Sequence, residues 1–198
     1  MRKLRFQDHR HYHCIGFRRW KRDHVMPFLT RSTGKIIFHT KERKAIETAQ
    51  NDGGAVIIWG SKETEKLSQN CDKAGVPLIR MEDGFIRSVG LGSDLVKGAS
   101  LVFDTSGIYY DPSRPSDLEN MLKTMDFTDA QRQRAENVQQ FILTQKLSKY
   151  NNPAQSLDIS DWPEDKHIIL IPGQVDNDAS IKKGAKDATV QSNFALLQ

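Results

Sequence analysis

The stretch AVIIWGSKETEKLSQNCDKAGVPLIRM, residues 55–81, decides the fold class. Its two ends, 55–60 and 76–81, are short apolar runs rich in β-branched residues, which is typical of buried strands. Between them lies a polar segment in which Ser61 can cap the start of a helix and Gly75 can end it. A strand, a helix and a strand in this order predict a βαβ unit with parallel strands.

Further strands are predicted on both sides of this unit. KIIFHT (35–40) is another short apolar run bounded by charged and polar residues. SLVFD (100–104) and GIYYD (107–111) predict two more strands, joined by a turn at TSG. The whole pattern favours an α/β domain with a parallel sheet covered by helices.

Two helices are predicted after residue 115. Ser116 with Glu119, and Thr128 with Gln131, have the spacing of a capping box, in which each side chain satisfies a backbone N–H group at the start of a helix. In the second helix, apolar residues recur at helical spacing, and this stripe is predicted to be buried in the core. The stripe consists of Ala135, Val138, Phe141 and Ile142.

The polar segment 151–165 predicts a linker, and HIILIPG (167–173) predicts the first strand of a further unit. Only residues 174–198 follow, too few for a second α/β domain. The expected organisation is one Rossmann-like domain joined to the first elements of a second. Its segments are a basic N-terminal arm at 1–30, the Rossmann-like acceptor-side domain at 31–150, the linker at 151–165 and the incomplete second domain at 166–198.

The composition is that of a soluble globular protein, with 37% hydrophobic and 27% charged residues. No apolar run approaches the length of a membrane span, and no apolar segment follows the basic N-terminus as a secretory signal requires. Cys14 and Cys71 have neither metal nor redox spacing, which is typical of a reducing compartment. We therefore expect a cytoplasmic protein.

The net charge of +4 is concentrated near the N-terminus. Such a block attracts polyanions, either nucleic acid or anionic lipid headgroups; the alternative is a solvated, partly disordered arm. His9, His11 and His13 would share a face only on a strand, and they lack a partner at zinc-like spacing, so we predict no metal site. The basic residues are Arg2, Lys3, Arg5, Arg10, Arg18, Arg19, Lys21 and Arg22.

Two polar loops follow predicted strands. RMEDGFIRSVGLG (80–92) leaves the strand at 76–81, and PGQVDNDASIKKG (172–184) leaves the strand at 167–173. In parallel α/β sheets, ligands bind beyond the carboxyl ends of the strands, so the two loops predict a cleft between two domains. Glycine permits close approach to an anion or a sugar, and arginine can hold carboxylates or phosphates.

Other interpretations of these loops are an ion-paired surface loop for the first and an Asx-rich turn for the second. GLGSDL (90–95) is an incomplete dinucleotide fingerprint, because Leu95 stands in place of the third glycine, and NAD is not expected. The DND sequence (176–178) lacks the later glutamate of a calcium loop, which makes calcium binding improbable.

Four motifs together resemble the KpsC-type capsule polysaccharide biosynthesis proteins, which are bacterial β-Kdo transferases. The resemblance runs in order from about residue 15 to the C-terminus. The motifs are RMEDGFIRSVGLGSDL (80–95), LVFDTSGIYYDPSRPSDLE (101–119), KLSKYN (146–151) and ILIPGQVDNDASI (169–181).

The resemblance implies a GT-B-like architecture, with two Rossmann-like domains facing each other across a cleft. It implies transfer of Kdo from CMP-Kdo, with retention, to a phosphatidylglycerol-type or Kdo-bearing lipid, and no cofactor or metal. Asp178 aligns with the catalytic aspartate, a role suited to an oxocarbenium-like transition state. The residues assigned to acceptor binding or to shaping the cleft are Glu82, Asp83, Arg87, Gln174 and Ser180.

The implied partners are the lipid-linked acceptor, the anionic surface of the inner membrane, and proteins of capsule assembly and export. Full-length relatives continue with a KPHPD-like motif and a Ser/Gly-rich loop for the donor nucleotide, neither of which occurs here. We therefore expect this chain alone to transfer little Kdo. The alternatives are a non-catalytic scaffold of capsule assembly and a basic nucleic-acid-binding module. Nucleic acid is the less expected partner, because the basic residues cluster at one end and no recognition motif occurs.

Overall fold

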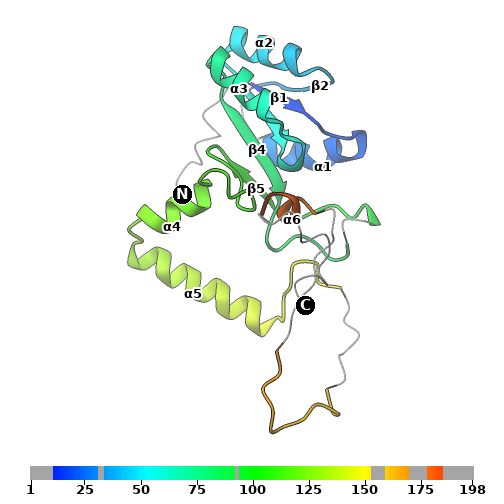
Figure 1. Ribbon diagram of the computed structural model, residues 1–198, viewed down its shortest axis with the longest axis vertical. Helices are drawn as coiled ribbons and strands as arrows, with labels where there is room; N and C mark the ends of the chain where they lie inside the picture. Colours follow the sequence, from blue (N-terminus) through cyan, green and yellow to red (C-terminus); the bar gives the residue numbers. More distant parts are fainter. Residues whose placement is uncertain (1–10, 31–33, 92–93, 153–158, 170–177, 185–198) are drawn as a thin grey trace.

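A five-stranded sheet with the order β2-β1-β3-β4-β5 forms the centre of the computed structural model, which describes residues 11–30, 34–91, 94–152, 159–169 and 178–184 (Figure 1). β1 to β4 run parallel, and β5 pairs antiparallel with β4 at one edge. The sheet confirms the predicted α/β class. Its strands are β1 (Tyr12–Ile15), β2 (Ile36–His39), β3 (Ala55–Trp59), β4 (Leu78–Asp83) and β5 (Leu101–Asp104).

Helices cover both faces of the sheet. Val25 and Leu29 of α1 (Arg19–Leu29) pack on one face with Ile57, and Ala45 of α2 (Glu42–Asp52) and Leu67 of α3 (Glu65–Ala74) pack on the other. The buried residues thus form two separate apolar clusters, one on each side of the sheet. The remaining helices are the 3₁₀ helix η2 (Gly60–Lys62), α4 (Asp117–Thr124), α5 (Asp129–Thr144) and α6 (Ala179–Gly184).

The assignment of 1–30 to an arm is wrong for residues 12–29, which form β1 and α1. β1 lies between β2 and β3, and all four of its residues are buried. A strand containing a histidine can be buried here because the His13 ring is paired, with Nδ1 2.9 Å from His39 Nε2 and Nε2 3.1 Å from Asp52 Oδ2. His13 is therefore a core residue, and the described residues contain no cluster of side chains suited to a metal ion.

Local signals gave two incorrect expectations between β3 and α4. Thr64, and not Ser61, caps α3, its hydroxyl accepting a hydrogen bond from Leu67 N. Residues 107–111 form turns in place of a strand, because the Asp104 carboxylate accepts hydrogen bonds from Ser106 N and Gly107 N and bends the chain directly after β5. The predicted end of α3 is confirmed.

α4 and α5 begin where the capping residues predicted, with hydroxyl caps at Ser116 and Thr128. The reciprocal capping box is complete at Thr128 and Gln131. The expected burial of the α5 stripe is wrong: Val138 is 46% and Phe141 60% exposed, and α5 extends away from the sheet (Figure 1). Helical spacing identifies an apolar face, but it does not show whether another element covers that face.

The later segments are described only in part. Residues 167–169, the first positions of a predicted strand, have no strand structure, and the rest of that strand lies outside the described residues. Residues 153–158 of the predicted linker also lie outside the described residues. Within the described ranges, every helix is too short or too polar to cross a lipid bilayer.

Candidate functional site

A polar pocket of about 470 Å³ lies at the carboxyl ends of β3 and β4. Its wall is formed by η2, the end of β4, the turns after β5, the segment after α5, and α6, which lies beside the end of β4 in Figure 1. The lining combines carboxylates, lysines and hydroxyl groups, a set suited to a ligand with both hydroxyl and acidic groups. It consists of Ser61, Lys62, Glu82, Asp83, Tyr109, Tyr110, Lys149, Tyr150, Asp178, Ala179, Ser180 and Lys182.

The topological switch point of the sheet lies next to this location. β1 connects to β2 on one side and is followed on its other side by β3, so the sheet has its switch point between β1 and β3. Gly16, which follows β1, has a φ of +77°, and a Cβ atom there would lie 3.3 Å from Lys62 Cβ. A glycine thus lets the ends of β1 and β3 approach closely beside the pocket.

Glu82 lines the pocket and has a raised pKa. Burial raises the pKa of its carboxyl group to about 7, and the nearby negative charge of Asp83 acts in the same direction. The Tyr110 hydroxyl lies 3.4 Å from Glu82 Oε2 as a donor. Burial also raises the pKa of Tyr109 to about 12, so both phenols keep their protons at neutral pH and can donate to a ligand.

Asp178 has a lowered pKa, in contrast to Glu82. Its Oδ1 accepts hydrogen bonds from Ser180 N at 2.8 Å and from Ser180 Oγ at 2.6 Å, and these bonds lower the pKa of Asp178. Asp178 therefore carries a negative charge at neutral pH. Because its carbonyl oxygen also accepts from Lys182 N at 3.1 Å, Asp178 is at the same time the N-terminal cap of α6.

Arg87 lies behind the pocket and holds its wall together. The side chain is 3% exposed, and Nε lies 2.9 Å from Asp83 Oδ2. Its backbone N–H donates to Lys149 O at 2.7 Å, and Gly90 N donates to Tyr150 O, also at 2.7 Å. The loop after β4 is thereby tied to the segment that carries Lys149 and Tyr150.

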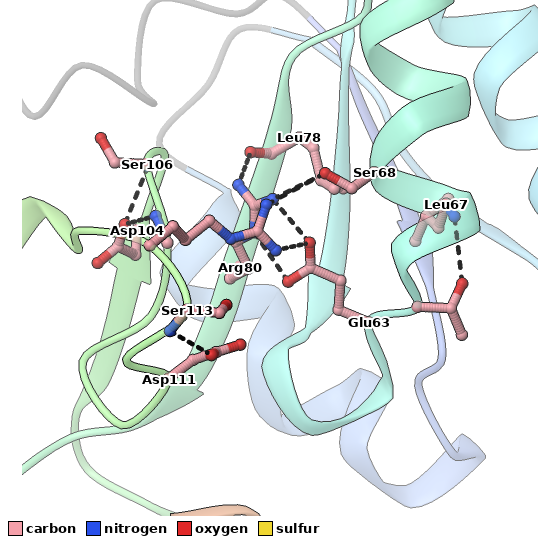
Figure 2. A network of polar contacts seen from close by, with 12 residues as sticks. Glu63, Leu67, Ser68, Leu78, Arg80, Asp104, Ser106, Asp111 and Ser113 are labelled. Carbon is pink, nitrogen blue, oxygen red and sulfur yellow. Dashed lines mark hydrogen bonds and ion pairs between the residues drawn. The ribbon is translucent and has the colours of Figure 1, made fainter. Parts of the chain in front are cut away.

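Beside the pocket, a buried ion-pair network joins α3, β4 and the turns after β5 (Figure 2). Glu63 contacts both Arg80 and Arg114, and Arg114 Nη1 donates to Ser68 Oγ at 3.2 Å. A second cavity, of about 440 Å³, lies over this network. Lys183 of α6 pairs with Asp111 at its edge, which fixes α6 against the turns after β5.

The structure brings four of the predicted site residues into one pocket: Glu82 and Asp83 from the end of β4, Asp178 and Ser180 from the start of α6. Arg87 lies behind it, and Gln174 lies outside the described residues. Sequence reasoning did not assign Lys62, Tyr109, Tyr110, Lys149 and Tyr150 to the site. All of these except Lys62 lie in the quoted motifs 101–119 and 146–151, which were the available signal.

Residues 54–198 match the family of capsule polysaccharide biosynthesis proteins. The match covers more than half of the chain, and this protein belongs to that family.

Two relatives are named as a capsule polysaccharide modification protein and a lipopolysaccharide-processing protein. The chain is 38% identical over 186 residues to the capsule polysaccharide modification protein LipA of Neisseria meningitidis, covering 94% of this chain and 26% of LipA. It is 36% identical over 175 residues to the lipopolysaccharide-processing protein LpsZ of Rhizobium meliloti, covering 86% of this chain and 40% of LpsZ. The chain thus spans between a quarter and two fifths of the length of these relatives.

Two solved structures from Thermosulfurimonas dismutans resemble this fold. The KpsC β-Kdo 2,4 transferase has a TM-score of 0.74 and 28% identity, over 96% of this chain and 56% of that one. The KpsC β-Kdo 2,7 transferase has a TM-score of 0.64 and 29% identity, over 94% and 55% respectively. This likeness confirms the predicted α/β, GT-B-like fold and the KpsC-type resemblance.

Proposed function

We propose that this chain supplies the acceptor-side wall and the catalytic aspartate of a β-Kdo transfer site, which uses CMP-Kdo as donor and a lipid-linked acceptor. The observation that carries the proposal is the meeting of two loops, distant in sequence, in one pocket. Glu82 and Asp83 are the last two residues of β4, and Asp178 precedes α6, yet all three carboxylates line the same cavity. The family and the Kdo-transferase neighbours support the reaction class.

The charges of the pocket suit the chemistry of a sugar acid. Asp178 is ionised at neutral pH, as required of a group that stabilises or traps an oxocarbenium-like centre. Lys62, Lys149 and Lys182 can neutralise the carboxylate of Kdo. Glu82, with a pKa of about 7, can hold the acceptor hydroxyl and accept its proton.

Exposed apolar side chains beside the pocket support a lipid-bearing acceptor and attachment to an anionic inner-membrane surface. Val89 is 73%, Leu95 60% and Phe85 56% exposed on the loop after β4. The ring of Phe85 lies 5.0 Å from that of Tyr109, so this apolar surface reaches the pocket wall. The exposed Lys97 on the same loop adds positive charge. Capsule assembly and export proteins are the proposed protein partners.

A chimera tests the reaction. This chain replaces the matching part of the T. dismutans KpsC β-Kdo 2,4 transferase, and transfer from CMP-Kdo to a Kdo-primed lipid is followed in a single turnover. Transfer by the chimera, lost in its Asp178→Ala variant, supports the proposal. A correctly folded chimera that binds neither CMP-Kdo nor the acceptor refutes it and favours the non-catalytic scaffold.

The membrane attachment needs a separate test with this chain and vesicles. Sedimentation with phosphatidylglycerol vesicles should increase with their anionic content and weaken with salt. Val89→Asp should reduce it, whereas Val138→Asp, on the exposed face of α5, is the matched control and should not. Binding that responds to neither salt nor Val89→Asp contradicts the proposed surface.

A further inference from the structure

Buried polar atoms without a hydrogen-bond partner gather at one place behind the pocket. Within the described residues, the buried side-chain atoms that lack such a partner are His24 Nε2, Asp83 Oδ1 and Arg87 Nε. Of these atoms, Arg87 Nε does form an ion pair, because it lies 2.9 Å from Asp83 Oδ2. His24 Nε2 and Asp83 Oδ1 form neither a hydrogen bond nor an ion pair, and burying such atoms unpaired costs about 1–3 kcal/mol each.

Both atoms face the same small space beside Gly98. A Cβ atom on Gly98 would lie 3.5 Å from His24 Nε2, 3.5 Å from Asp83 Oδ1 and 3.4 Å from Arg87 Cγ. These are ordinary contact distances, so both polar atoms border the same side of Gly98. A water molecule placed between them can donate to one and accept from the other.

The surrounding charges select an uncharged occupant. Arg87, Lys21 and Lys97 place positive charge around His24 and disfavour a bound cation, while Asp83 disfavours an anion. Burial, reinforced by these cations, lowers the pKa of His24, although Asp83 acts in the opposite direction. The imidazole is therefore neutral at neutral pH, and its tautomer with the proton on Nε2 can donate one hydrogen bond.

We propose that one water molecule occupies this space and bridges His24 to Asp83, and that His24 is thereby a positioning residue for a carboxylate of the pocket. His24 Nε2–H donates to the water oxygen, and the water donates to Asp83 Oδ1. Arg87 holds Oδ2, so the carboxylate is fixed from two sides. The water site does not depend on the ligand of the pocket, whereas the effect of His24 on the acceptor KM rests on the proposed Kdo transfer.

Gly98→Ala tests the occupant directly, because the new methyl group fills the space without a steric clash. High-resolution crystal structures of the parent and the variant are compared. We expect one ordered water within hydrogen-bond distance of His24 Nε2 and Asp83 Oδ1 in the parent, and none in Gly98→Ala. Gly184→Ala, where an added Cβ meets nothing within 4 Å, is the matched control and should retain the water. An empty space in the parent, or a metal ion there, overturns the proposal.

Solution measurements keep the proposal testable if the variant does not crystallise. A long-lived bound water gives a nuclear Overhauser effect to the His24 Nε2 proton, and this signal should vanish in Gly98→Ala. If the parent protein gives no such signal and its His24 carries a proton on Nδ1 alone, the proposed bridge is contradicted.

The positioning role has its own readout in the chimera. His24→Gln keeps a donor and should retain the acceptor KM, whereas His24→Leu should raise that KM about tenfold, the effect of about 1.4 kcal/mol of lost interaction. A His24→Leu variant with a lowered melting temperature but unchanged KM shows a structural role only. Because the water is tested without transfer, failure of the Kdo proposal and failure of this one are distinguishable.

Discussion

Glu63 and Arg80 form a two-point ion pair, with Arg80 Nε 3.0 Å from Glu63 Oε2 and Nη2 2.7 Å from Oε1 (Figure 2). The two side chains are 2% and 4% exposed. Arg80 also donates to the carbonyl oxygens of Leu78 and Thr105, so the guanidinium connects β4 to the turn after β5. This pair fixes the end of β3 and η2 against β4 directly beside the pocket.

Glu63→Gln should destabilise the protein by about 3–5 kcal/mol, because it leaves the buried charge of Arg80 unpaired. The control is Arg114→Ala, which removes the other partner of Glu63. Arg114 is 34% exposed, and its loss should cost about 1 kcal/mol or less. Urea unfolding at pH 7 measures both. Equal losses in the two variants would show that the pair with Arg80 has no special role.

The pH dependence of stability should change in Glu82→Gln. The pKa of Glu82 is about 7 in the folded protein and 4.5 ordinarily, so between these values the folded state holds a proton that the unfolded state has lost. Stability must therefore fall as the pH rises from about 4.5 to 7, by up to about 3 kcal/mol, and level off above. Glu82→Gln should remove this decline in urea unfolding between pH 5 and 8. The exposed Glu164→Gln should keep the decline.

Two substitutions of Asp178 separate its charge from its capping role. Asparagine caps a helix as well as aspartate does, so Asp178→Asn should leave the melting temperature unchanged and abolish transfer by the chimera. Asp178→Ala should abolish transfer and also loosen α6, visible as faster amide exchange at Lys182. Near-normal transfer by Asp178→Asn would show that Asp178 acts only as the cap.

Phe141→Ser should change the free energy of unfolding by only about 0.5 kcal/mol, because Phe141 is 60% exposed on α5. Ile57→Ala, at a fully buried position of β3, should cost about 2–5 kcal/mol. Urea unfolding of the two variants compares them. A loss above 2 kcal/mol for Phe141→Ser would place the α5 face in a core or interface.

The parts of the fold that the sequence predicted are those set by local chemistry. The β-branched runs of β3 and β4, the left-handed glycine at Gly75 and the hydroxyl caps at Ser116 and Thr128 depend on neighbouring residues alone. β1 was missed because it has only four residues and includes His13, whose burial depends on Asp52 and His39. Such distant partners cannot be read from a local pattern.

The candidate site was predictable to the same extent. The first segment was found because polar residues follow the apolar run of β4. Its approach to Asp178 does not follow from the parallel sheet, because residues 167–169 have no strand structure. The tyrosines after β5 were missed because the run Ile108–Tyr110, β-branched and aromatic, favoured a strand. The Glu63–Arg80 pair joins positions far apart in the chain, and neither residue has a sequence signal that marks it.

The interior position of β1 in the sheet has a consequence for how the protein is made. Tyr12 pairs with Ile36 on one side and with Ala55 on the other, so β1 gains its neighbours only after β2 and then β3 have left the ribosome. Until then, both edges of an apolar strand stay open to other chains, a situation in which nascent proteins aggregate. The interval between the synthesis of β1 and that of β3 is thus one in which a chaperone would protect these open edges.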